Sequence, residues 1–248
     1  MAAAVVGGVV GSFLNVCIHR LPLGMSVARP GSSCPSCGRP LVWFDNIPIV
    51  SYLALAGRCR TCHTAISVRY PLVEAVTAAM FAALLWHFGP GALLASKLVF
   101  GCLLLMLFAI DLEHHVLPNV LTVPGIIAGF LFSTIAEPGW MASLAGIVLG
   151  GGSLWLLYEV WLAIRREEAL GFGDVKMLAM IGAFLGWRLM LLALVLASFA
   201  GSLVGLVILA ARKGSMKSAL PFGTFLALGA AIAATLGQGV IDWYLRFW

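Results

Sequence analysis

Long apolar stretches dominate this sequence and restrict what it can fold into. Eight of them follow one another along the chain, at about 2–18, 72–88, 93–110, 120–136, 141–164, 175–186, 189–211 and 221–245. A helix needs about 20 mostly apolar residues to cross a hydrocarbon core of about 30 Å. Only 10% of the residues are charged, against about 25% in a soluble domain. The sequence therefore predicts an all-α polytopic membrane protein with about eight transmembrane helices.

Basic residues predict how these spans are oriented. With eight spans, twelve lysines and arginines fall on one face of the membrane and three on the other. The larger group contains Arg20, Arg29, Arg39, Arg58, Arg60, Arg69, Arg165, Arg166, Lys176, Arg212, Lys213 and Lys217, and the smaller contains Lys97, Arg188 and Arg246. Cytoplasmic loops carry an excess of Lys and Arg, so we expect the larger group, and not the termini, to face the cytosol.

The net charge of +5 is then a matter of topology and of attraction to anionic membrane lipid. The basic residues form no stripe and have no interleaved aromatic residues that could stack on bases. The sequence therefore predicts no nucleic-acid partner.

The longest polar segment, 21–70, lies on the predicted cytosolic face and contains two CxxC pairs. These are Cys34-Pro-Ser-Cys37 and Cys59-Arg-Thr-Cys62. Two such pairs supply the four thiolates of a closed tetrahedral zinc site, which leaves no open position and is structural. Disulfides and free thiols are the alternatives, and a reducing cytosol argues against disulfides. We expect a zinc-binding loop domain here.

Two aspartates fall at the ends of apolar stretches on the same predicted face. Asp111 ends the third stretch, and Asp174 opens the sixth within Gly171-Phe-Gly-Asp-Val-Lys176. Carboxyl groups held close together share a proton, and such a pair can activate water and protonate a leaving amine. Each aspartate taken singly could instead cap a helix at the membrane interface. Glu74, which begins the second stretch, could pair with an arginine or face a polar site.

Several further motifs accompany these residues in a fixed order. They are Gly11-Ser-Phe-Leu-Asn-Val16, His19-Arg20-Leu-Pro22, Asp45-Asn-Ile-Pro48 with Ser51, Ile66-Ser-Val-Arg-Tyr-Pro-Leu-Val-Glu74, Leu117-Pro118 and Pro221-Phe-Gly223. Together with the cysteines and aspartates, they make nearly the whole chain resemble the type IV prepilin peptidases, which are bifunctional bacterial leader peptidases and N-methyltransferases. Asn119 departs from the pattern, because the family often has Asp after Leu-Pro.

The resemblance implies a GxGD-type intramembrane aspartic peptidase of the bacterial inner membrane, with Asp111 and Asp174 as catalytic residues. Its partners would be type IV prepilins or type II secretion pseudopilins, cleaved where the leader meets the membrane on the cytosolic side. The new amino terminus, usually of phenylalanine, would then be methylated with S-adenosylmethionine. The chain has no glycine-rich dinucleotide fingerprint, and the resemblance places methyl transfer near Asn46, Pro48 and Glu74.

We therefore expect three parts: a first transmembrane helix at 1–20, the four-cysteine domain at 21–70, and a peptidase domain at 71–248. Two other functions compete with this interpretation. A peptidase without methylation, similar to the archaeal preflagellin enzymes, is disfavoured by the cysteine-bearing loop, which those relatives lack. A channel or transporter should place ionisable groups near the middle of the membrane, whereas the clearest carboxyl groups here lie at helix ends.

Overall fold

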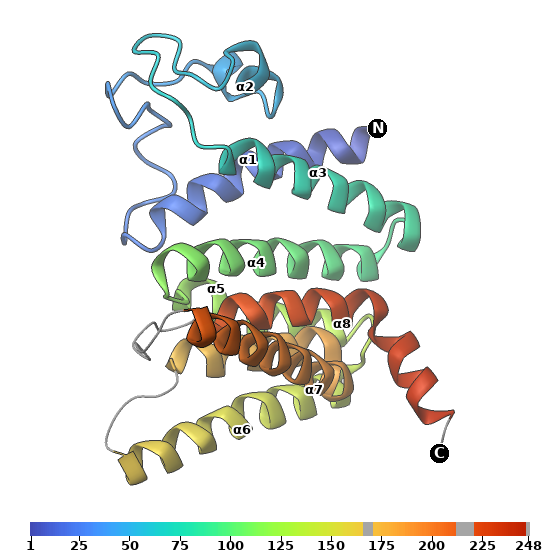
Figure 1. Ribbon diagram of the computed structural model, residues 1–248. Coiled ribbons are helices and arrows are strands. Elements are labelled where there is room, and N and C mark those ends of the chain that lie inside the picture. The colour runs from blue at the N-terminus through green and yellow to red at the C-terminus, as the bar shows by residue number, and fades with distance from the viewer. Residues whose placement is uncertain (166–170, 212–220, 247–248) are drawn as a thin grey trace. The chain divides into compact units, whose positions relative to one another are not determined.

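The described residues of this chain, 1–165, 171–211 and 221–246 of the computed structural model, form helices and contain no β-strand. Arg166, Arg212, Lys213 and Lys217, which we expect on the cytosolic face, lie outside the described residues. A short 3-10 helix, η1 (Trp43–Asn46), lies within the long polar segment. The α-helices are α1 (Ala2–Arg20), α2 (Val50–Ala54), α3 (Arg69–Phe88), α4 (Ala92–His114), α5 (Asn119–Ser133), α6 (Trp140–Arg165), α7 (Phe172–Ala211) and α8 (Phe222–Leu245) (Figure 1).

The predicted fold class is confirmed, with a small difference in the helix count. Six of the described helices are long and apolar enough to cross a membrane, namely α1, α3, α4, α6, α7 and α8. The apolar helix α5 has only 15 residues and is shorter than that criterion. The sixth and seventh predicted spans both belong to α7, which has 40 residues.

A reversal at Gly186 divides α7 into two halves. A Cβ atom added to Gly150 of α6 would lie 2.9 Å from the carbonyl oxygen of Leu178 and 3.3 Å from the sulfur of Met190. A straight helix would separate residues 178 and 190 by about 18 Å, so the chain doubles back between them. Gly186 makes this possible with φ 75° and ψ 170°, a conformation that side chains disfavour. The two predicted spans therefore exist as antiparallel helices joined by one glycine.

The chain divides into two compact units, Met1–Leu98 and Val99–Trp248. The division falls inside α4, and the expected three-part division at residues 20 and 70 stays a prediction. Each unit is described below by itself.

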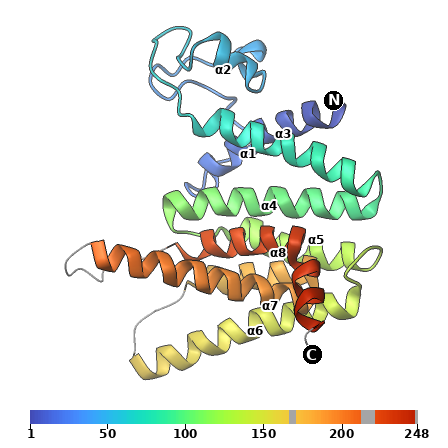
Figure 2. The ribbon, with the colours of Figure 1, turned by 45° about the vertical axis from the view of Figure 1, so that its right-hand side comes forward.

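The first unit is built on the packing of α1 against α3, which both views show side by side (Figures 1 and 2). A Cβ atom on Gly7 would lie 2.7 Å from the carbonyl oxygen of Thr77, and one on Gly11 would lie 2.8 Å from the Cα of Glu74. The two glycines therefore let the helix backbones touch, as small residues do in membrane helix pairs. The side-chain amide of Asn15 adds a hydrogen bond to the Tyr70 carbonyl oxygen at 3.0 Å.

The second unit encloses the first half of α7. Its side chains Met177, Leu178, Met180 and Ile181 are fully buried, with α5 and α6 against them. Gly182 of α7 meets Gly146 of α6 so closely that a Cβ atom on either would overlap the carbonyl group of the other. The second half of α7 lies against α8, as Figure 2 shows, where a Cβ atom on Gly229 would lie 2.5 Å from the Ala193 carbonyl oxygen.

We predict that Gly146→Ala destabilises the second unit, because the added methyl group meets backbone and not a movable side chain. Overpacking of this kind typically costs about 1–3 kcal/mol, which should appear as a lower unfolding temperature in detergent. Gly152→Ala is the matched control on the same helix, since nothing lies within 4 Å of the position of its Cβ. Equal unfolding temperatures for the two variants would contradict the packing described here.

Candidate functional site

The four cysteines of the polar segment come together as predicted. The sulfur atoms of Cys34, Cys37, Cys59 and Cys62 all lie within 4.8 Å of one another, and Cys34 Sγ is 3.7 Å from Cys62 Sγ. A tetrahedral zinc ion with Zn–S bonds of about 2.3 Å would separate its sulfur ligands by about 3.8 Å. The four thiols therefore fit a tetrahedral metal site.

Each cysteine pair lies on a turn of the same design. In the first turn the Cys34 N–H donates to the Arg39 carbonyl oxygen, and the Gly38 N–H donates back to that of Cys34, both at 2.9 Å. The second turn repeats this with Cys59, Thr64 and His63, at 2.9 and 3.0 Å. Gly38 and His63 occupy equivalent positions, with φ of 70° and 56°. Because the two turns have the same geometry, the sulfur atoms of both cysteine pairs lie around one point.

Hydrogen bonds around the cluster favour the metal-binding thiolate forms of Cys62 and Cys34 but not that of Cys37. The Thr64 hydroxyl, 3.4 Å from the Cys62 sulfur, and the Thr64 backbone N–H lower the pKa of Cys62 to about 6. The backbone N–H groups of Cys37 and Ser36 likewise lower the pKa of Cys34. The Arg39 backbone N–H also lowers the pKa of Cys37, but desolvation and hydrogen bonds with the other cysteines outweigh it and raise that pKa to about 11.

The second turn is tied to the 3-10 helix η1. Arg60, between Cys59 and Cys62, donates from Nε and Nη2 to Oδ1 of Asp45, at 3.0 and 2.7 Å. The Arg60 guanidinium also lies 5.2 Å from the centre of the Phe44 ring. These contacts link the cysteine cluster to the segment that carries Asn46 and Pro48.

We predict that the purified protein binds about one metal ion per chain, measured by elemental analysis, because four thiols close one tetrahedral site. Cys37→Ser should lower this stoichiometry sharply. Cys102→Ser is the control, because Cys102 lies outside the cluster. A metal-free protein that is nevertheless fully folded would contradict the assignment.

The three residues expected near methyl transfer also come together. A pocket of about 250 Å³ has Asn46 and Pro48 on one side and Ser12 of α1 on another. Glu74 of α3 is buried, with 8% of its surface exposed, and lies beside this pocket. Its Oε2 accepts a hydrogen bond from the Ile49 N–H at 2.7 Å, and Ser12 is near enough to influence the carboxyl group electrostatically. Within the described residues of its unit, the Ile49 N–H is the hydrogen-bond partner of the Glu74 carboxyl group, and a pairing with an arginine is not seen.

Asp111 lies in the last turn of α4 and is held by the start of α8. Its carboxyl group is buried, with 5% of the residue exposed. The backbone N–H and the hydroxyl of Thr224 both donate to Oδ2, at 2.6 and 3.0 Å. Thr224 lies in the first turn of α8, where backbone N–H groups have no partner within the helix and attract anionic groups. The adjacent Gly223 leaves room for the carboxyl group, since a Cβ there would lie 3.0 Å from Asp111 Oδ2.

Asp174 lies in the first turn of α7 and is also buried, with 8% exposed. Its carboxyl group is close enough to that of Asp111 for the two to interact electrostatically. Leu117, from the segment that links α4 to α5, packs against both sites, because Cβ atoms on Gly173 and Gly223 would lie 2.8 and 3.0 Å from its side chain. The structure thus brings together the two predicted aspartates from helices that are far apart in the sequence.

Two contributors to this site were not predicted from the sequence. Nothing in the sequence indicated that Thr224 would hold Asp111, apart from its position after Pro221-Phe-Gly223. Leu117 was noted only as part of a motif. Asn119, the departure from the family pattern, accepts a hydrogen bond from Lys176 Nζ at 2.7 Å. An aspartate there could bind Lys176 in the same way, so the departure preserves a link between α5 and α7.

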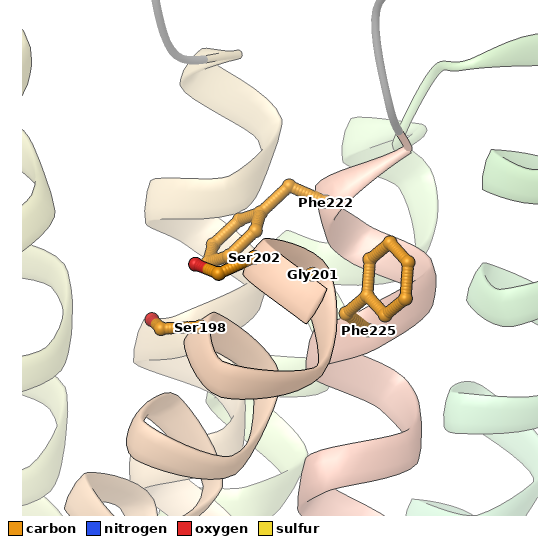
Figure 3. A pocket seen from close by; sticks show the side chains of 5 residues that line it. All are labelled: Ser198, Gly201, Ser202, Phe222 and Phe225. Carbon is orange, nitrogen blue, oxygen red and sulfur yellow. The ribbon is translucent and has the colours of Figure 1, made fainter. Parts of the chain in front are cut away.

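A second pocket, of about 360 Å³, lies between α7 and α8 (Figure 3). It is lined by Ser198, Gly201, Ser202, Phe222 and Phe225. Phe222 is two residues from Thr224, which holds Asp111. None of these lining side chains is ionisable.

Comparison with known proteins agrees with these two sites. Residues 5–88 match the model of the bacterial peptidase A24 N-terminal domain, and residues 98–206 match that of the type IV leader peptidase family. The chain is similar to the prepilin leader peptidase/N-methyltransferase of Pseudomonas aeruginosa, with 37% identity covering 100% of this chain and 93% of that protein. No solved structure matches the chain.

Proteins of the same description from two other bacteria are similar as well. The one from Myxococcus xanthus is 46% identical over 84% of this chain and 62% of its own length, and that from Burkholderia pseudomallei is 40% identical over 95% and 84%. The fold and the paired aspartates define a polytopic membrane protein with a two-carboxyl site. This chain belongs to the type IV leader peptidase family.

Proposed function

We propose that this protein cleaves the leader peptide of type IV prepilins and type II secretion pseudopilins and then N-methylates the new amino terminus. The names of its relatives support both activities. The main support for the peptidase activity is the pair of buried aspartates, Asp111 and Asp174. They lie at the ends of two different membrane helices.

Asp111 and Asp174 act as a catalytic pair. Two carboxyl groups that interact at a shared buried site do not both ionise readily, so one keeps a proton while the other is charged. The charged carboxylate takes a proton from water as the water attacks the peptide carbonyl, and the protonated partner gives its proton to the leaving amine. Thr224 keeps the Asp111 carboxyl group in position through its two hydrogen bonds.

The protein lies in the bacterial inner membrane with this site facing the cytosol. Support comes from the distribution of Lys and Arg and from the six long apolar helices. In the second unit, Asp111, Asp174 and Lys176 lie at helix ends on the predicted cytosolic face, whereas Gly186, beside Arg188, lies at the opposite end of the first half of α7. A leader that emerges into the cytosol would meet the aspartates at the membrane boundary.

Methyl transfer takes place in the first unit, at the pocket beside Asn46, Pro48 and Glu74. S-adenosylmethionine supplies the methyl group there as a sulfonium. The cysteine cluster holds a structural zinc ion and has no open position for chemistry. The cluster has a structural role, because the ion pair between Arg60 and Asp45 connects it to the segment that lines the pocket.

For the peptidase, we predict that Asp111→Asn and Asp174→Asn each abolish cleavage of a prepilin in membranes. Loss of general acid–base catalysis typically costs about 10²–10⁴ in rate. Asp242→Asn is the matched control, because Asp242 is exposed near the other end of α8. Cleavage retained by either catalytic variant would refute the pair.

For the methyltransferase, we predict that mass spectrometry of the mature pilin shows one methyl group added at its amino terminus. Asn46→Ala should reduce this methylation and leave cleavage intact, because Asn46 lies in the other unit from the aspartates. Gln238→Ala, which removes an exposed amide from the second unit, should leave both activities intact. An unmethylated product in the presence of S-adenosylmethionine would favour a peptidase without methyltransferase activity.

A further inference from the structure

A polar cluster lies between α1 and α3 next to the pocket, and two of its three side chains are buried. It consists of Ser12 and Asn15 on α1 and Glu74 on α3. Asn15 is 2% exposed, and its Oδ1 atom has no hydrogen-bond partner in the part of the chain that the structure describes. A buried acceptor without a partner is costly, by about 1–3 kcal/mol. Such an atom calls for a donor from outside the described chain, which a ligand or a bound water can supply.

The cluster offers several acceptors. One N–H of the Asn15 side-chain amide donates to the Tyr70 carbonyl oxygen, while its Oδ1 stays available as an acceptor. Glu74 contributes a carboxylate, and the described residues give it no basic partner. Acceptors that surround a negative charge suit a ligand with several N–H donors and a positive charge.

Two residues connect this cluster to the pocket. Ser12 lines the pocket and lies near enough to the Glu74 carboxyl group to influence it electrostatically. Pro48 also lines it, packs 3.4 Å from the Cβ position of Gly8, and precedes Ile49, whose N–H bonds to Glu74. Ile49 has φ 62°, an outlier for a β-branched residue, and strained residues of this kind concentrate at functional sites.

The rest of the pocket suits an apolar group. Val9, Phe13 and Val16 form its α1 side, and no lining residue is basic. The amino-acid end of S-adenosylmethionine carries a carboxylate beside its ammonium group, and that carboxylate would find no cationic partner among the residues that line the pocket. A cleaved pilin instead presents an ammonium group directly attached to an apolar first residue.

We propose that Ser12, Asn15 and Glu74 bind the new terminal amine of the cleaved substrate, an inference that rests on the methyltransferase function proposed above. The Glu74 carboxylate accepts a proton from the ammonium group and leaves a neutral amine. The nitrogen lone pair then forms a bond to the methyl carbon of the sulfonium donor as the carbon–sulfur bond breaks and sulfur keeps the electron pair. The pocket thus holds the methyl acceptor through its amine and its first side chain.

A purely structural role for Glu74, holding Ile49, predicts different behaviour. Glu74→Gln separates the two roles, because the amide oxygen of glutamine can still accept the Ile49 N–H while the negative charge is lost. Ser12→Ala removes a neutral acceptor from a partly exposed position and leaves the charge. Thr77→Val is the control on α3, since among the described residues the Thr77 hydroxyl donates to the Val73 carbonyl oxygen of its own helix.

The test is binding of two synthetic peptides to the full-length protein in detergent, without methyl donor. Both peptides begin with phenylalanine followed by apolar residues, one with a free amino terminus and one acetylated. The wild-type protein should bind the free amine at least about tenfold more tightly, since a charge-assisted hydrogen bond is worth about 1.5–3 kcal/mol. Glu74→Gln should remove most of this preference, Ser12→Ala should reduce it severalfold, and Thr77→Val should retain it.

A wild-type protein that binds both peptides equally, or a Glu74→Gln protein with the full preference, would overturn the inference. If Glu74→Gln does not fold, an unchanged preference in Ser12→Ala overturns it instead. Cleavage and methylation are measured on the same wild-type preparation. A preparation that does not methylate refutes the proposed function, whereas one that methylates with amine binding insensitive to these residues refutes only this inference.

Discussion

Contact between helix backbones at glycine is the interaction on which both units depend. Lipid tails are as apolar as the helices, so burial of apolar side chains does little to bring membrane helices together, and close packing has to do so. Gly7 and Gly11 bring α1 onto α3 in the first unit, and Gly146 and Gly182 bring α6 onto α7 in the second. At each contact the two helices lie so close together that there is no room for an added methyl group, so their relative position is closely defined.

That accuracy matters because the functional groups are attached to different helices. Asp111 closes α4, Asp174 opens α7, and Thr224 lies in the first turn of α8. Their geometry is set by helix packing and by the glycines beside each carboxyl group, with Leu117 filling the space between. In the first unit the same logic holds for Ser12, Asn15 and Glu74, whose helices meet at Gly11.

Most of the fold could be predicted from the sequence, because apolar stretches and paired cysteines are local patterns with a strong physical cause. The eight stretches match the described helical segments, and Cys34, Cys37, Cys59 and Cys62 cluster as their spacing indicated. Proximity of Asp111 and Asp174 could be proposed only from a shared face of the membrane.

Other features had no signal in the sequence. The donor that holds Asp111 is largely a backbone N–H, which every residue except proline possesses. The unpaired oxygen of Asn15 depends on where Tyr70 lies, and the reversal at Gly186 depends on a backbone angle that many glycines never adopt. Interactions of this kind are determined by three-dimensional packing and not by residue type.

The reversal at Gly186 also sets the depth of the chemistry. The first half of α7, from Phe172 to Leu185, has 14 residues and a length of about 21 Å, against a hydrocarbon core of about 30 Å. With Gly186 at the far interface, Asp174 is twelve residues, or about 18 Å, away along the helix. It would then lie about 12 Å below the near interface unless the bilayer thins around the protein. The first half of α7 would then be shorter than the hydrocarbon core is thick. The acyl-chain length of the surrounding lipid would therefore govern how readily water and substrate reach the aspartates.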